Sequence, residues 1–163
     1  LPMKAKSWIF EGIRWIAVVA AVVYLLVMFG GSGMSSASFA EVSAAVMETV
    51  DTTNMQQAEN RMVKRLYGLE PGSFEGCLLY YPTTNMGAEE VLIVKLSDPA
   101  QGELVADAVQ QRLQTQRNTF EGYGVEQFDL LTNHYVLQVQ GNFALFAVGT
   151  FSGDALAAFR DAL

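Results

Sequence analysis

The sequence predicts an α+β domain carried on a membrane anchor, and three observations lead to this fold class. Residues 15–29 carry no charge, which is typical of a membrane-spanning helix. After them, apolar residues recur first at helical spacing and then in short runs bounded by turn residues, which are typical of strands. We therefore expect the order α-α-β-β-α-β-β-α after the anchor, with helices packed on a four-stranded, largely antiparallel sheet.

The predicted anchor covers residues 15–34. Spanning a bilayer takes about 20 helical residues, and the next ionisable residue after the apolar run is Glu41. The alternative is a cleaved signal peptide, for which the small residues at 34–38 offer a cleavage site. We divide the chain into a cytoplasmic N-terminus (1–14), the anchor (15–34), a flexible tether (35–38) and the domain (39–163).

The charge distribution predicts the orientation of the chain. Three basic residues and one acidic residue precede the apolar run, a balance of +2, whereas seven basic and sixteen acidic residues follow it, a balance of −9. Positive charge favours the cytoplasmic side, so we expect a single-pass plasma-membrane protein whose domain is extracytoplasmic. A domain this acidic is also a poor match for nucleic acid, which is bound through Lys and Arg.

The first half of the domain begins with two predicted helices. Ser38 and Glu41 form a capping-box pattern, and Val42 and Val46 continue it at helical spacing. A second helix is predicted over residues 57–67, where Gly68 ends it. Two apolar runs then predict strands, at residues 77–81 and 91–96.

In the second half of the domain, the spacing of apolar residues again changes from that of a helix to that of strands. Asp98-Pro99 starts a helix that we expect to fade near Asn118. Residues 135–140 alternate between two faces, and Gly141-Asn142 predicts a hairpin turn with glycine first, leading into a strand at 143–148. One face of the strand at 135–140 carries both polar and apolar residues, so we expect this strand to lie near an edge of the sheet. A last helix is predicted from residue 152 to the end of the chain.

No catalytic or metal-binding motif stands out. Cys77 begins an apolar run. His134 is the only histidine, and the sequence has no Gly-x-Ser-x-Gly motif whose serine it could activate. We therefore predict no catalytic residue, no metal and no cofactor. We interpret Glu89-Glu90 as a solvated acidic face. We expect the basic residues of the second helix to pair locally with carboxylates such as Glu59, and these basic residues are Arg61, Lys64 and Arg65.

One surface is predicted to bind a partner. Arg112 and Gln116 lie four residues apart, so they share a helical face, and glycines on both sides of Tyr123 let its ring project. Two polar residues of the exposed strand complete the predicted patch, Gln138 and Gln140. The alternatives are that Arg112 and Gln116 hydrogen-bond the loop around Tyr123, and that Tyr123 fills the core behind the helix.

Four segments together resemble a bacterial family, the domain-of-unknown-function family 4358. They are GAEEVLIVKLSD at 87–98, RLQTQ at 112–116, NTFEGY at 118–123 and QGNF at 140–143. The resemblance covers roughly residue 39 to the C-terminus and implies a protein of the Gram-positive envelope, where many members are lipoproteins. This chain has no cysteine directly after its apolar segment, which favours a helical anchor.

The leading hypothesis is a non-catalytic interaction domain that binds an envelope protein or polymer. The resemblance also implies an alternative, an accessory subunit of an envelope-polymer O-acylation complex. A third hypothesis is a hydrolase that uses Cys77 or His134.

Overall fold

The computed structural model describes residues 33–163, and a compact unit spans Met34–Leu163. The predicted cytoplasmic N-terminus and residues 15–32 of the predicted anchor lie outside the described residues. Within the described part of the chain, no helix is long and apolar enough to cross a membrane.

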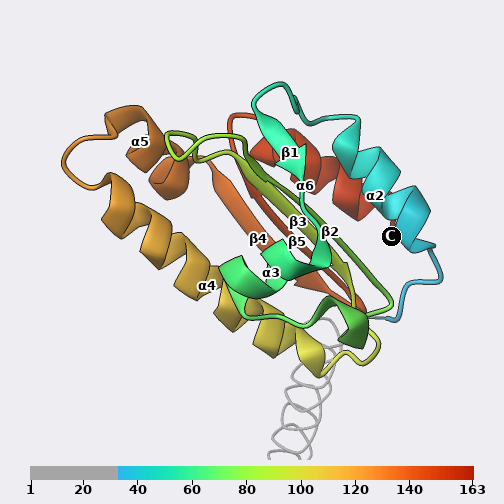
Figure 1. Cartoon of the computed structure of the whole chain (residues 1–163). Coiled ribbons are helices and arrows are strands. Elements are labelled where there is room, and N and C mark those ends of the chain that lie inside the picture. Colours follow the sequence, from blue (N-terminus) through green and yellow to red (C-terminus); the bar gives the residue numbers. More distant parts are fainter. Residues whose placement is uncertain (1–32) are drawn as a thin grey trace, which may run out of the picture. The chain divides into compact units, whose positions relative to one another are not determined.

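The described unit contains both helices and strands along the chain (Figure 1). In order, the elements are α2 (Phe39–Met47), β1 (Met55–Gln57), α3 (Asn60–Tyr67), the 3-10 helix η1 (Pro71–Ser73), β2 (Gly76–Pro82), β3 (Glu90–Lys95), α4 (Gln101–Phe120), α5 (Val125–Asn133), β4 (Tyr135–Gln140), β5 (Phe143–Val148) and α6 (Ser152–Asp161).

The predicted α+β class is confirmed, but the predicted four strands and element order differ from the structure in detail. The sheet has five strands in the order β1-β2-β3-β5-β4, and every neighbouring pair is antiparallel. The additional strand, β1, is only three residues long and pairs with the end of β2, where Gln56 lies opposite Tyr81. The second difference is α5, which lies between the predicted long helix and the hairpin.

Helices cover both faces of the sheet, which makes three layers (Figure 1). One face carries Leu92, Val94 and Phe146 and packs against α3, α4 and α5. The other carries Ile93 and Leu145 and packs against α2 and α6. Because β3 and β5 lie in the middle of the sheet and are covered on both sides, their sequences are apolar at nearly every position.

Local signals explain how several elements begin and end. The predicted capping box is present, since the Ser38 hydroxyl accepts a hydrogen bond from the Glu41 backbone N–H and the Glu41 carboxylate accepts one from the Ser38 N–H. Gly68 ends α3 in the left-handed conformation, at φ 68°. Gly141 has φ 59° in the hairpin turn, as the glycine-first turn requires.

The chain enters the domain at one end of the sheet. At this end, which we call the Lys95 end, Lys95 pairs with Gly76 and Phe143, and the β4–β5 turn lies beside them. The opposite end, which we call the Glu90 end, holds the β2–β3 loop. The Ser35 backbone N–H donates to Asn142 Oδ1 in that turn at 2.9 Å, so residue 35, predicted as part of a flexible tether, is fastened to the Lys95 end.

Removing the Asn142 side chain should release this attachment. Asn142 is 3% exposed and also donates from Nδ2 to the Ser35 carbonyl at 3.3 Å. We expect Asn142→Ala to lower the free energy of unfolding by about 1–2 kcal/mol and to speed proteolysis at residues 34–37. Urea unfolding and limited proteolysis measure the two effects. Asn133→Ala, which removes an exposed asparagine from α5, is the control, and equal losses from both variants would contradict the assigned role.

Candidate functional site

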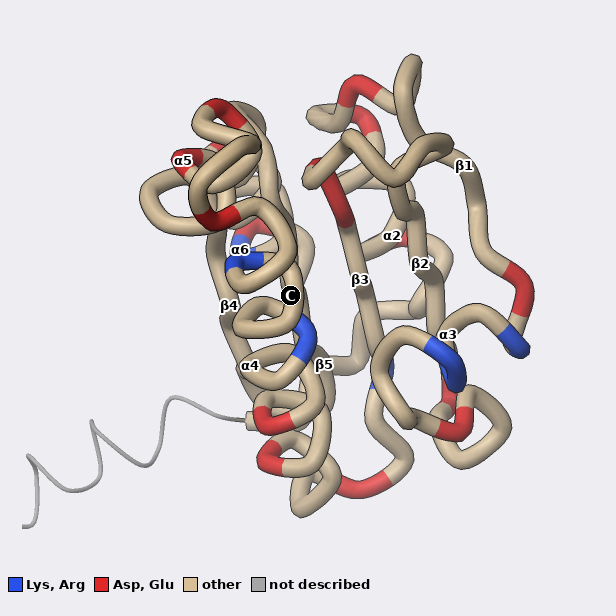
Figure 2. The backbone as a smooth tube through the Cα atoms, turned by 60° about the vertical axis from the view of Figure 1, so that its left-hand side comes forward, with Lys and Arg blue, Asp and Glu red and all other residues tan. Residues whose placement is uncertain are grey.

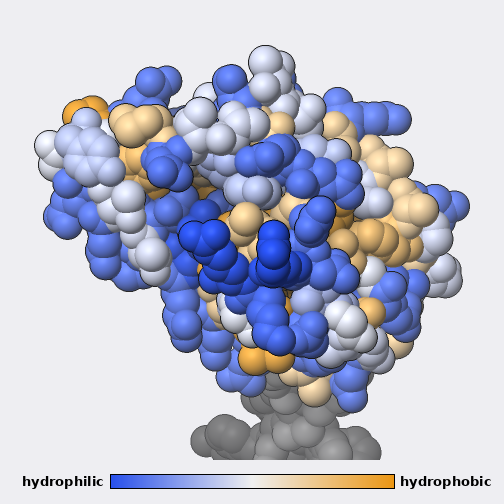
Figure 3. All heavy atoms as spheres, viewed as in Figure 1, coloured by the Kyte–Doolittle hydropathy of each residue, from blue (hydrophilic) through white to orange (hydrophobic). Residues whose placement is uncertain are grey.

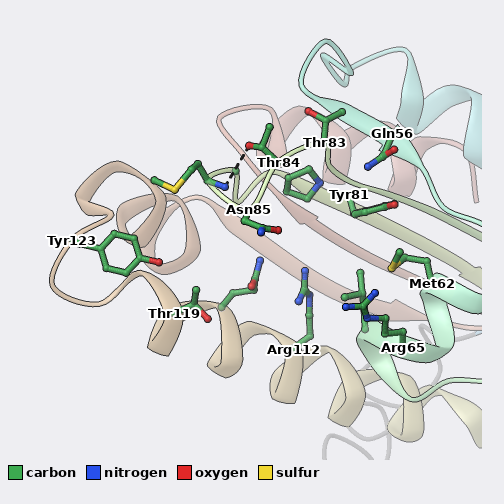
Figure 4. Close-up of a pocket in the computed structure, with 15 residues that line it drawn as sticks. Gln56, Met62, Arg65, Tyr81, Thr83, Thr84, Asn85, Arg112, Thr119 and Tyr123 are labelled. Carbon is green, nitrogen blue, oxygen red and sulfur yellow. Dashed lines mark hydrogen bonds between the residues drawn. The ribbon is translucent and has the colours of Figure 1, made fainter.

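A polar pocket of about 530 Å³ lies between α3, α4 and the β2–β3 loop (Figure 4). Its size falls within the range of about 300–1,000 Å³ typical of ligand sites. Arg65 reaches it from α3 and Arg112 from α4, and Asn85 faces them from the loop. The pocket therefore brings together three segments that are distant in the sequence.

Among residues 33–163, none of those that line this pocket carries a carboxylate. Neutral polar side chains surround the two arginines, and they are Gln56, Thr83, Thr84, Asn85, Gln116 and Thr119. Acidic positions are spread over many of the helices and loops of the domain, whereas the short helix α3 alone carries three basic positions, Arg61, Lys64 and Arg65 (Figure 2). Figure 3 likewise shows strongly hydrophilic side chains gathered over α3. The pocket is thus a locally basic site in an acidic domain.

A buried ion pair holds Arg112 in place. Its Nη2 donates to Glu90 Oε2 at 2.7 Å and its Nε donates to Glu90 Oε1 at 3.2 Å. Glu90 is 1% exposed and also accepts a hydrogen bond from the Tyr67 hydroxyl. This two-point contact fixes the plane of the guanidinium group beneath the pocket, and among the described residues Nη1 has no hydrogen-bond partner.

The ionisation of this cluster follows from its burial. Burial raises the pKa of Tyr67 well above its ordinary value, and the charge of Glu90 adds to the shift, so the phenol stays protonated and donates. Burial alone lowers the pKa of Arg112, but the hydrogen bonds and charge of Glu90 outweigh it and the net shift of this pKa is upward. The interpretation of Glu89-Glu90 as a solvated pair is therefore wrong for Glu90, whose side chain lies on the covered face of β3.

The rim of the pocket is partly apolar. Met86 and Tyr123 both line it, and each is 59% exposed. The ring of Phe120, which is 1% exposed, fills the core, and the Tyr123 ring lies against it with centroids 5.9 Å apart. Tyr123 therefore projects, as its flanking glycines predict, and does not fill the core behind the helix.

The structure divides the predicted partner patch into two groups. Arg112, Gln116 and Tyr123 line the same pocket. Gln138 instead accepts a hydrogen bond from Arg160 of α6 at 2.8 Å, and strand alternation places Gln140 on the same face as Gln138. The two groups lie on opposite faces of the sheet, because α4 packs against the other side of β4.

A second pocket lies on the other side of the β2–β3 loop and is acidic. Its volume is about 350 Å³, and Glu89 and Glu126 line it. Burial raises the pKa of Glu89, and the charges of Asp51 and Glu126 add to the shift. Among residues 33–163, no group of three or more metal-ligating side chains comes together.

The basic residues of α3 have different surroundings. Lys64 pairs with Glu70 at 2.6 Å and not with Glu59, and both partners of this pair are exposed. Arg65 is exposed and forms no ion pair with the described residues. Of these side chains, Arg65 is the one that lines the larger pocket.

Cys77 and His134 lie at opposite ends of the sheet. Cys77 pairs with Val94 near the Lys95 end, whereas His134 precedes β4, whose first residue pairs with Val148 at the Glu90 end. Asp129 lies 3.5 Å from His134, and both side chains are about half exposed. Burial raises the pKa of the Cys77 thiol to about 11, so the thiol is protonated near neutral pH.

We expect Cys77 to react slowly with iodoacetamide in the folded protein. At pH 7.5 a pKa of about 11 leaves about a hundredfold less thiolate than in an unfolded chain, and the folded rate should rise as the pH approaches 11. Mass spectrometry of the alkylated protein, folded and in urea, measures the two rates. Equal rates at pH 7.5 would contradict the assigned environment.

Comparison with known proteins gives one match. A family model described as "Domain of unknown function (DUF4358)" matches residues 48–149, which include every strand and the whole polar pocket. No curated protein and no solved structure gives a significant match.

Proposed function

The chain belongs to the DUF4358 family of domains of unknown function, and from this premise we propose that it is a membrane-anchored, extracytoplasmic binding domain of the bacterial envelope. The binding site is the polar pocket between α3, α4 and the β2–β3 loop. The observation that carries this proposal is the guanidinium group of Arg112, which buried Glu90 holds at the pocket floor.

The position of the pocket supports this function. The chain enters the domain at the Lys95 end through Ser35, whereas the β2–β3 loop that lines the pocket leaves the sheet at the Glu90 end. An attachment through the chain before Ser35 would therefore leave the pocket at the far end of the sheet, where a partner has access.

A binding role without catalysis accounts for the remaining candidate residues. Cys77 is protonated near neutral pH and lies at the other end of the sheet from His134, so the two do not form a nucleophile–base pair. This arrangement disfavours the hydrolase hypothesis for these two residues.

The anchored orientation has its own test. Protease added to intact, wall-stripped cells should digest the domain, because the +2 and −9 charge balances favour a domain outside the cytoplasm. Protection of the domain, or a mature N-terminus near Ser38, would overturn the anchored form.

Site-specific photo-crosslinking tests the pocket itself. A photoreactive amino acid at Tyr123, on the pocket rim, should crosslink to an envelope component in cells, and one at exposed Ala44 on α2 should not. Arg65→Glu should abolish the Tyr123 crosslink, whereas Arg160→Glu, which changes an arginine on the other face of the sheet, should preserve it. Equal crosslinking from Tyr123 and Ala44 would contradict the proposal. Capture of a multi-span membrane enzyme would identify the domain as its accessory subunit.

A further inference from the structure

We propose that the pocket binds an acidic carbohydrate, meaning a sugar that carries a carboxylate or phosphate group. This inference rests on the proposed binding function and specifies its ligand.

The charge of the pocket points to an anion. The charges of Arg112 and Glu90 balance each other, so Arg65 leaves the pocket with a net positive charge, which no carboxylate among the described lining residues opposes. A guanidinium group forms paired hydrogen bonds to the two oxygens of a carboxylate or phosphate. In a domain with a charge of −9, this local excess of positive charge defines where an anion is accepted.

The neutral side chains point to a ligand rich in hydroxyl groups. The amides of Gln56, Asn85 and Gln116 each supply both donors and acceptors, and a sugar hydroxyl also does both. A simple carboxylate such as acetate offers acceptors alone, and inorganic phosphate carries far fewer hydroxyl donors for the amide oxygens than a sugar does. The neutral lining therefore favours a hydroxylated anion over a simple one.

Two aromatic rings supply apolar contact surface. Tyr81 lies in the pocket and Tyr123 on its rim, where Tyr123 is 59% exposed. A tyrosine ring presents an apolar face together with a polar hydroxyl, which suits the C–H face of a sugar ring. Two arginines are also too few for strong nucleic-acid binding, which depends on neutralising many phosphates.

Ligand-observed saturation-transfer NMR on the full chain in detergent micelles tests the inference. Glucuronate and glucose 6-phosphate are the two acidic probes and distinguish a carboxylate from a phosphate. Glucose, acetate and inorganic phosphate are the controls. We expect at least one acidic sugar to bind at least tenfold more tightly than glucose and than the matching simple anion.

Matched variants locate the binding. Arg65→Gln should weaken the acidic sugar about tenfold or more, because it removes a charged donor, and Arg160→Gln should leave the affinity unchanged. Both variants should keep the melting temperature of the wild type, since each side chain is exposed. Equal affinity for glucose and the acidic sugars, no saturable binding of any probe, or no effect of Arg65→Gln would overturn the ligand assignment. If the Tyr123 crosslink persists in that case, the binding function stands and only its ligand is wrong.

Discussion

Glu90→Gln should lower the free energy of unfolding by about 3 kcal/mol or more. The substitution keeps the size of the side chain but removes the charge that compensates Arg112 inside the domain. Breaking a buried ion pair from one side costs about 3–5 kcal/mol, because the remaining charge is left without a partner. Urea unfolding of the variant and the wild type measures this loss.

Two further variants make the test specific. Glu70→Gln breaks the exposed pair with Lys64 and should cost less than about 1 kcal/mol. The triple variant Tyr67→Phe, Glu90→Leu, Arg112→Met replaces the whole cluster with apolar groups and should recover much of the stability lost by Glu90→Gln. It should nevertheless lose the Tyr123 crosslink, since Arg112 is gone from the pocket. A loss from Glu90→Gln no larger than that from Glu70→Gln would contradict the buried pair.

Phe120→Ala should also cost about 3–5 kcal/mol, whereas Tyr123→Ala should cost about 1 kcal/mol or less. Phe120, the last residue of α4, is 1% exposed with its ring in the core, so its removal leaves a cavity. Tyr123 is 59% exposed, and its contact with the Phe120 ring is the packing that is lost.

The same urea unfolding measures both aromatic variants. Tyr123→Ala should retain the fold while reducing binding at the pocket rim. A reversed order of the two losses would mean that Tyr123 fills the core, as the alternative interpretation of its sequence holds.

Much of the fold could be predicted from local sequence signals. The capping box at Ser38, the helix end at Gly68 and the turn at Gly141 each depend on residues close in the chain, and each is present in the structure. The alternation of residues 135–140 also identifies an edge strand, because one face of β4 carries polar side chains.

The missed elements lack such signals. β1 has three residues, of which Met55 alone is buried, so no alternation is visible. α5 begins after Gly124 without a side-chain cap, and its first residue, Val125, is 82% exposed. Both elements are held by tertiary contacts, which a short sequence window does not contain.

The candidate site was predictable in part. The helical spacing of Arg112 and Gln116 and the glycines around Tyr123 identify three pocket residues. The sequence does not single out Glu90, because two adjacent glutamates at the start of a strand are typical of a solvent-exposed strand end. Glu90 is nevertheless two residues from Leu92, so the two side chains lie on the same, covered face of the strand. The order of the strands in the sheet brings Arg65 and the β2–β3 loop to the pocket. No local sequence pattern predicts that order.

Hydrogen–deuterium exchange of the full chain can decide whether partners bind at the polar pocket. Exchange is measured with the protein in its own membranes and again after purification in detergent, which removes partners of any chemical class. We predict slower exchange in the native membranes at residues 83–87 and 119–124, which border the pocket, and unchanged exchange in α2 and α6. Equal exchange at the pocket in both preparations, or protection confined to α2 and α6, would show that the pocket is not the binding site.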